Sequence, residues 1–113
     1  MAQRTDKEIA IGKVKRFYKT LISLGYKVDS LYLFGSHVKS RNRPDSDVDI
    51  AVVLKSPVKN IFLEQVNLMR IAGKFEDSSI EVHPFDEVLF RKGNPFINEI
   101  KRTGVRVIVG EGQ

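Results

Sequence analysis

The segment from Val48 to Leu54 constrains the fold more than any other part of the chain. It reads VDIAVVL, so that, apart from Asp49, both alternating sets of side chains are apolar. Successive side chains of a strand point to opposite faces of the sheet, and a strand that is apolar on both faces is typical of a buried position. The segment therefore predicts a central strand with a carboxylate close to its beginning.

The residues around this strand predict a small mixed β-sheet with helices. Apolar residues at helical spacing predict helices that begin at Thr5, Asn60 and Pro95, and short apolar runs predict further strands over residues 30–34, 80–85 and 105–109. The loop between 30–34 and 48–54 is too short for a helical crossover, so these two strands are expected to pair antiparallel. The fold class expected is α/β or a two-layer α+β domain over 1–113, with helices packed on one face of the sheet.

The composition excludes several classes of protein. The chain has 113 residues, of which 42% are hydrophobic and 29% charged, as in soluble single-domain proteins. No apolar run approaches the roughly 20 residues of a membrane span, and the N-terminal residues do not resemble a signal peptide, so we expect a cytoplasmic protein without membrane contact. The chain lacks cysteine, which excludes thiolate metal sites. Its net charge of +5 suits either a polyanionic ligand or an ordinary solvated surface.

Two carboxylates lie where the predicted central strand begins. Asp47 and Asp49 are two positions apart, so in extended backbone they point to the same side. Two like charges this close repel each other and are costly to remove from water, unless a divalent cation lies between them. Carboxylate oxygens favour Mg²⁺ or Mn²⁺ over zinc. The pair therefore predicts a metal site, although such a pair taken alone is also typical of a solvated strand end.

The dipeptide Gly35-Ser36 follows the strand predicted over 30–34 and lies at the rim of the sheet. Glycine lets the backbone approach a ligand closely, and a serine hydroxyl with neighbouring N–H groups can hold phosphate oxygens. A Gly-Ser after a strand is by itself most often a simple turn. Antiparallel pairing of the two strands, however, brings it beside Asp47 and Asp49, so that phosphate donors and metal ligands converge on one nucleoside triphosphate.

This combination resembles the signature of a known family, the minimal nucleotidyltransferases of the DNA polymerase β-like superfamily. The family signature is G-S, ten residues, and D-x-D between two apolar strands, and the spacing of Gly35-Ser36 from Asp47-Val48-Asp49 is similar. The resemblance covers nearly the whole chain, because the α-β-β-α-β order and the small size also recur. It implies the polymerase β-like nucleotidyltransferase fold and transfer of a nucleoside monophosphate, expected to be AMP from ATP, to a hydroxyl group.

The resemblance also implies a third carboxylate on the strand predicted over 80–85. The candidates are Glu81, within that strand, and Asp86, directly after it. Glu81 is the preferred residue, because the family has an acidic residue between apolar neighbours at this position, although that residue is usually aspartate. The alternative for Glu81 is an ordinary charge on an exposed strand face.

By the same resemblance, Asp47, Asp49 and Glu81 are the catalytic residues and hold two Mg²⁺ or Mn²⁺ ions. Gly35 and Ser36, together with the two aspartates, are the nucleotide-binding residues. The two histidines, His37 and His83, are interpreted as polar positions without a partner. Basic residues of the loop between the two halves of the motif suit either phosphate binding or a solvated loop: Lys39, Arg41 and Arg43.

The sequence shows no site for the acceptor of the nucleotide. Stand-alone members of the family are frequently antitoxins paired with an all-helical HEPN ribonuclease, which some of them inactivate by attaching AMP to a tyrosine. The resemblance therefore implies a HEPN-type partner encoded nearby. Two other classes stay open: a module that neutralises its partner by contact alone, and a nucleotide- or RNA-binding domain without transfer. The sequence decides neither direct nucleic-acid binding nor the oligomeric state.

Overall fold

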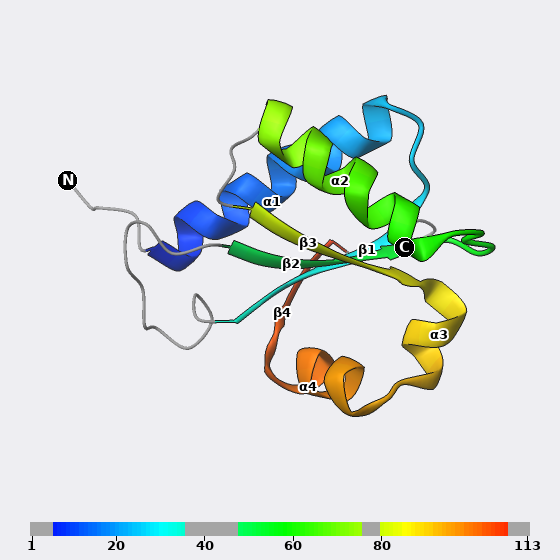
Figure 1. Cartoon of the computed structure of the whole chain (residues 1–113). Helices are drawn as coiled ribbons and strands as arrows, with labels where there is room; N and C mark the ends of the chain where they lie inside the picture. The colour runs from blue at the N-terminus through cyan, green and yellow to red at the C-terminus, as the bar shows by residue number, and fades with distance from the viewer. Residues whose placement is uncertain (1–5, 36–47, 76–79, 109–113) are drawn as a thin grey trace.

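The computed structural model of the chain describes residues 6–35, 48–75 and 80–108. Within these ranges the elements follow each other as helix, strand, strand, helix, strand, two helices and strand (Figure 1). Their bounds are α1 (Asp6–Ser23), β1 (Val28–Phe34), β2 (Val48–Leu54), α2 (Ile61–Phe75), β3 (Ile80–Asp86), α3 (Glu87–Lys92), α4 (Pro95–Thr103) and β4 (Val105–Ile108). In this part of the chain, no helix has the length and apolar character needed to cross a membrane.

The strands form one mixed sheet in the order β3-β2-β1-β4. β1 pairs antiparallel with β2, as the short loop between them predicts, and also antiparallel with β4. β2 and β3 pair in parallel, and α2 makes the crossover between them. The interior place of β2 confirms the prediction drawn from its two apolar faces.

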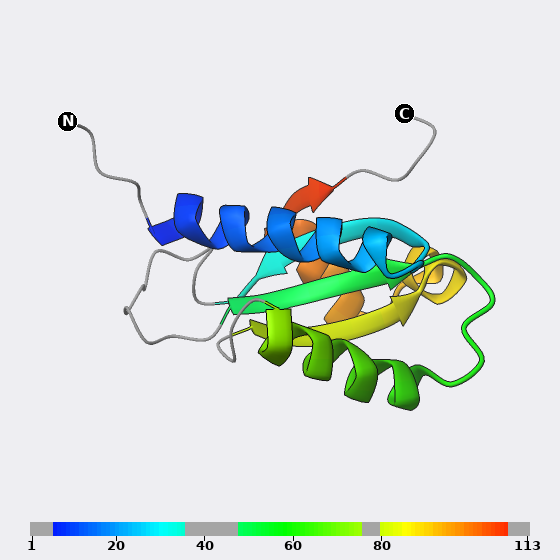
Figure 2. The same cartoon turned by 90° about the horizontal axis from the view of Figure 1, so that it is seen from above.

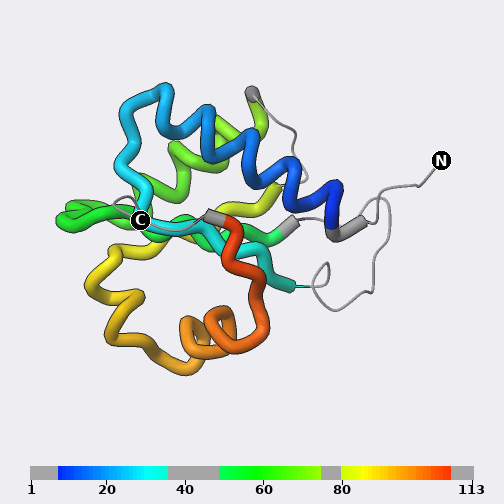
Figure 3. Tube along the Cα trace, turned by 180° about the vertical axis from the view of Figure 1, so that it is seen from behind, coloured from blue at the N-terminus to red at the C-terminus, as the bar shows by residue number. Residues whose placement is uncertain are grey.

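Helices cover both faces of this sheet, and here the fold differs from the expected single helical layer. α1 and α2 lie along one face (Figures 1 and 2). Seen from behind, α3 and α4 lie on the other face (Figure 3). The alternation of β2 explains the difference, because Ile50, Val52 and Leu54 pack in the core with α1 and α2, whereas Ala51 and Val53 pack in a second core.

The second core is small and is closed by the last two helices. It contains Phe90 of α3, and Ile97 and Ile100 of α4, all buried against the two β2 residues. Partly buried aromatic side chains from β1 and β3 pack at its border: Tyr32, Phe34 and Phe85. This core places α4 beside the end of the sheet where β2 begins.

Most predicted element boundaries agree with the structure to within two residues. The Asn60 side chain accepts a hydrogen bond from the backbone N–H of Leu63, at 3.0 Å, and so caps α2 as expected. Gly25 ends the first helix region with a φ of 93°, the left-handed conformation that glycine adopts most easily. The capping role predicted for Thr5 lies outside the described residues.

Candidate functional site

Strand pairing brings the predicted site residues to one end of the sheet. In the antiparallel register Phe34 lies opposite Asp49, so that Gly35 directly follows the residue paired with this aspartate. In the parallel register Asp49 lies opposite Glu81. The other two predicted residues, Ser36 and Asp47, lie outside the described part of the chain.

Gly35 lies directly beside the Asp49 carboxylate. Its φ is 89°, a conformation that residues with a side chain rarely adopt. A Cβ atom at this position would collide with Oδ2 of Asp49. The sequence therefore needs glycine here for two reasons, the backbone conformation and the space that the carboxylate occupies.

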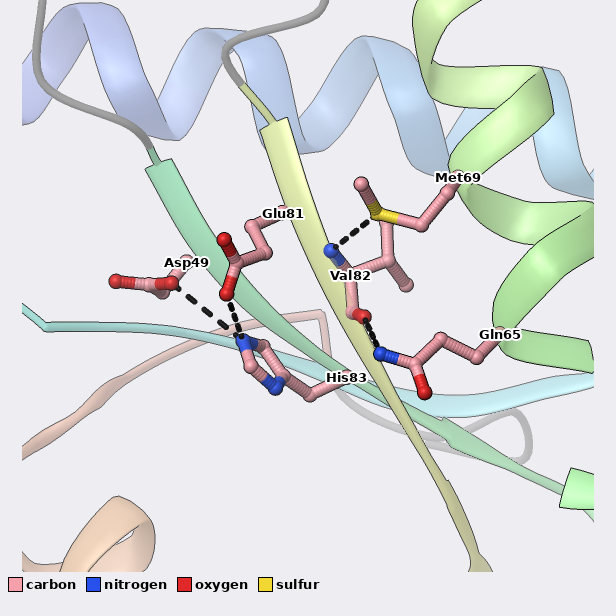
Figure 4. Close-up of polar contacts among 6 residues, drawn as sticks. All are labelled: Asp49, Gln65, Met69, Glu81, Val82 and His83. Atoms are coloured by element: carbon pink, nitrogen blue, oxygen red, sulfur yellow. Dashed lines mark hydrogen bonds and ion pairs between the residues drawn. The ribbon is translucent and has the colours of Figure 1, made fainter. Parts of the chain in front are cut away.

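Three side chains with metal-ligating atoms converge at this end of the sheet (Figure 4). The Nε2 atom of His83 lies 3.4 Å from Oδ1 of Asp49 and 3.3 Å from Oε1 of Glu81. One ligand atom from each of the three residues lies within 4.8 Å of the others. About a quarter of the Asp49 and His83 side chains is exposed, and about half of Glu81, so the cluster is open to ligands from solution.

The donor set fits a divalent cation. Two carboxylates and an imidazole are common ligands of divalent metals, and the open side leaves positions for water or phosphate oxygens. Because Gly35 lacks a Cβ, Oδ2 of Asp49 can occupy the space beside it, while Oδ1 lies near His83. The residues that are present could therefore hold a metal ion through Asp49, Glu81 and His83.

The structure corrects the interpretation of His83 as a residue without a partner. Its ring contacts both carboxylates and also packs against two phenylalanines, with ring centroids 5.2 Å from Phe34 and 6.2 Å from Phe96. The sequence contained a usable signal, since His83 is two residues after Glu81 on a strand and so shares its face. The contact of His83 with Phe96 could not be predicted from the sequence, because Phe96 belongs to the second helical layer.

The backbone between Glu81 and His83 is held by α2. β3 is an edge strand, and the backbone N–H of Val82 donates a hydrogen bond to Sδ of Met69, at 3.1 Å. The Val82 carbonyl accepts a bond from Nε2 of Gln65, at 3.4 Å (Figure 4). These contacts satisfy backbone groups at the open edge of the sheet and fix the residue that separates the two site side chains.

Asp86, the other candidate for the third carboxylate, lies at the opposite end of β3, where it pairs with Leu54. Its carboxylate accepts hydrogen bonds from the Ser56 hydroxyl and from the backbone N–H groups of Val58 and Val88. These bonds, above all that from Ser56, hold the pKa of Asp86 below its ordinary value. Asp86 therefore caps α3 and binds the loop that follows β2. It lies at the end of the sheet opposite Asp49, away from the candidate site.

The chain matches the model of one known protein family. A family model described as a nucleotidyltransferase domain matches residues 12–110. No curated protein sequence matches the chain.

Several solved structures resemble the fold. One is a candidate nucleotidyltransferase from Sulfolobus solfataricus, with 20% identity, a TM-score of 0.60, and coverage of 94% of this chain and 89% of that one. Another is a toxin–antitoxin structure with AMP-PNP, with 20% identity, a TM-score of 0.62, and coverage of 89% and 74%. A third holds a tri-AMPylated HEPN toxin from Shewanella oneidensis in complex with an MNT antitoxin, with 18% identity, a TM-score of 0.57, and coverage of 93% and 74%.

Proposed function

The chain belongs to the nucleotidyltransferase domain family, and from that premise we propose that it transfers AMP from ATP to a hydroxyl group of a partner protein. The observation that carries this proposal is the position of Asp49, which lies opposite Glu81 on the neighbouring strand and beside the backbone of Gly35. Carboxylates at this place are suited to hold divalent metal, and a glycine-containing strand end is suited to approach phosphates.

We assign the roles as follows. Asp49 and Glu81, together with Asp47, hold the metal, and Gly35 with Ser36 binds the phosphates of ATP. A bound divalent ion, Mg²⁺ or Mn²⁺, supplies positive charge to the phosphate oxygens during transfer. The carboxylate of Glu81 is about half exposed, so an acceptor can reach it from solution.

The proposed reaction is a displacement at the α-phosphorus. The acceptor oxygen forms a bond to this phosphorus, the bond from the phosphorus to the β-phosphate oxygen breaks, and pyrophosphate leaves with the bonding electrons. The proton of the acceptor hydroxyl passes to Oε of Glu81. The residues of the chain thus bind and orient the triphosphate and take up one proton.

We propose a HEPN-type toxin encoded nearby as the partner, and hence the role of an antitoxin. Support comes from two of the solved structures with a similar fold, one a toxin–antitoxin with AMP-PNP and one a tri-AMPylated HEPN toxin bound to an MNT antitoxin. Both share the fold with this chain at low sequence identity, so the partner and the AMP transfer are proposed here by analogy.

The test is transfer of label from ATP labelled at the α-phosphate. The chain is incubated with Mg²⁺, the labelled ATP and the HEPN-type protein encoded next to it, and the partner is then separated and counted. We expect covalent label on the partner with the parent chain and none with Asp49→Asn. Tight binding of the partner without any label would instead favour neutralisation by contact alone.

A further inference from the structure

We propose that His83 is itself a metal ligand, so that the site binds Mn²⁺ more tightly than Mg²⁺. This inference rests on the proposed function, because it concerns the metal site assigned there. It adds a nitrogen ligand from this chain to the carboxylates of Asp49 and Glu81.

The distances around Nε2 of His83 suit ligands of one metal ion. The atom lies 3.4 Å from Asp49 Oδ1 and 3.3 Å from Glu81 Oε1, whereas N–H···O bonds are mostly about 2.9–3.0 Å long. The contact with Oδ1 of Asp49 is thus a long hydrogen bond, which one N–H group can share with a second acceptor. Ligand atoms about 2.1 Å from a common ion, at right or tetrahedral angles, lie about 3.0–3.4 Å from each other. The two separations measured from Nε2 of His83 match that spacing.

The surroundings hold the ring in this position. The rings of Phe34 and Phe96 pack against His83, and these two rings also contact each other, with centroids 5.9 Å apart. On the strand, the hydrogen bonds of Val82 to α2 fix the backbone between Glu81 and His83. The imidazole is therefore held beside the carboxylates by ring packing and by the fixed backbone.

The chemistry of the donor atoms gives the expected selectivity. Oxygen ligands alone suit Mg²⁺, which binds water and carboxylates in a regular octahedron and gives up water reluctantly. Imidazole nitrogen favours transition metals over Mg²⁺, and Mn²⁺ is a transition metal that also suits carboxylate oxygens. A site with Nε2 of His83 beside two carboxylates should therefore favour Mn²⁺.

The competing role for His83 is that of a cation that neutralises the two carboxylates and moves away when a metal enters. In that case the ring lies outside the ligand sphere of the bound ion. Removing the ring would then leave Mn²⁺ affinity unchanged or raise it, which is the opposite of what a ligand predicts.

Pulsed electron paramagnetic resonance of the full chain with bound Mn²⁺, without nucleotide, separates the two roles. We expect the modulation of a directly bound imidazole ¹⁴N in the parent and its loss in His83→Gln. His37→Gln is the matched control, because it removes the other of the two histidines of the chain. It should keep the signal, since His83 is still present. Replacing histidine ¹⁴N by ¹⁵N in the unmutated chain should change the modulation without any risk to folding. An oxygen-only signal in the parent would overturn the proposal.

Metal titration gives a second readout. His83→Gln should weaken Mn²⁺ binding by roughly tenfold or more, since even the loss of a residue that only supports a ligand costs 10–100-fold, and should change Mg²⁺ binding less. Equal losses for both ions would contradict the proposal. The two proposals fail separately: nitrogen-bound Mn²⁺ in a chain that transfers no AMP would refute only the proposed function, and oxygen-only Mn²⁺ in an active chain only the role of His83.

Discussion

Replacing Gly35 by alanine should damage the metal site more than the fold. The backbone φ of 89° is unfavourable for any residue with a Cβ, at a cost of roughly 1–2 kcal/mol. The new Cβ would also collide with Oδ2 of Asp49. That oxygen is the end of a side chain, so the carboxylate can rotate, and the additional loss of stability should stay near the lower end of the roughly 1–3 kcal/mol typical of overpacking. The rotated carboxylate, however, no longer faces the metal.

Gly25 provides a matched control for this substitution. Its φ is 93°, nearly that of Gly35, but a Cβ added there would have no atom within 4 Å. Gly25→Ala should therefore lower the free energy of unfolding only by the cost of the backbone conformation, and it should leave metal binding intact. In a chain that already carries Asp49→Ala, Gly35→Ala should cost no more than Gly25→Ala, because the atom in conflict is gone.

The assays are urea unfolding followed by circular dichroism, and calorimetric titration with Mn²⁺. We expect Gly35→Ala to lose most of its metal affinity, whereas Gly25→Ala keeps that of the parent. If both variants bind Mn²⁺ equally well, the argument that Gly35 makes space for a metal-binding carboxylate is refuted.

Two further predictions concern the rest of the fold. Ile97→Ala should lower the free energy of unfolding by about 2–5 kcal/mol, because Ile97 is fully buried in the second core. Leu89→Ala, at a half-exposed position of α3, should lower it by less than about 0.5 kcal/mol. Equal small losses for the two variants in urea unfolding would show that α4 does not cover the sheet. Hydrogen bonds, above all that from Ser56, lower the pKa of Asp86 in the folded chain, so its contribution to stability is present above the ordinary carboxyl pKa and is lost as pH falls through the lowered value. Between pH 7 and 2, the free energy of unfolding should therefore fall more steeply for the parent than for Asp86→Asn. Parallel pH profiles for the two proteins would contradict this.

The element order was accessible from the sequence because its signals are local. The two apolar faces of Val48–Leu54, the cap at Asn60 and the turn at Gly25 each depend on a few neighbouring residues. The antiparallel pairing of β1 and β2 followed from a short connection. The prediction of Asp49 as a metal ligand followed from its place close to the beginning of a buried strand.

The second helical layer and the role of His83 depend on contacts between distant segments. The helices at 87–92 and 95–103 are short, and only the packing of Phe90, Ile97 and Ile100 on β2 shows which face they cover. His83 meets Asp49 through the register of a parallel strand pair, and Phe96 through this second layer. Register between strands joined by a helix is not encoded in local spacing, so these contacts required the structure.

The most direct test of the central claim compares AMP transfer and ATP binding in Glu81→Gln. The substitution keeps the size of the side chain but removes the charge that is proposed to hold metal and accept the proton of the acceptor. We predict that transfer of label to the HEPN-type partner is lost while most of the ATP affinity remains, the pattern of a group that acts mainly in the transition state. Glu81→Asp should keep part of the activity. Transfer by Glu81→Gln at the rate of the parent would contradict the account, because Glu81 would then be only a charge on the surface of β3.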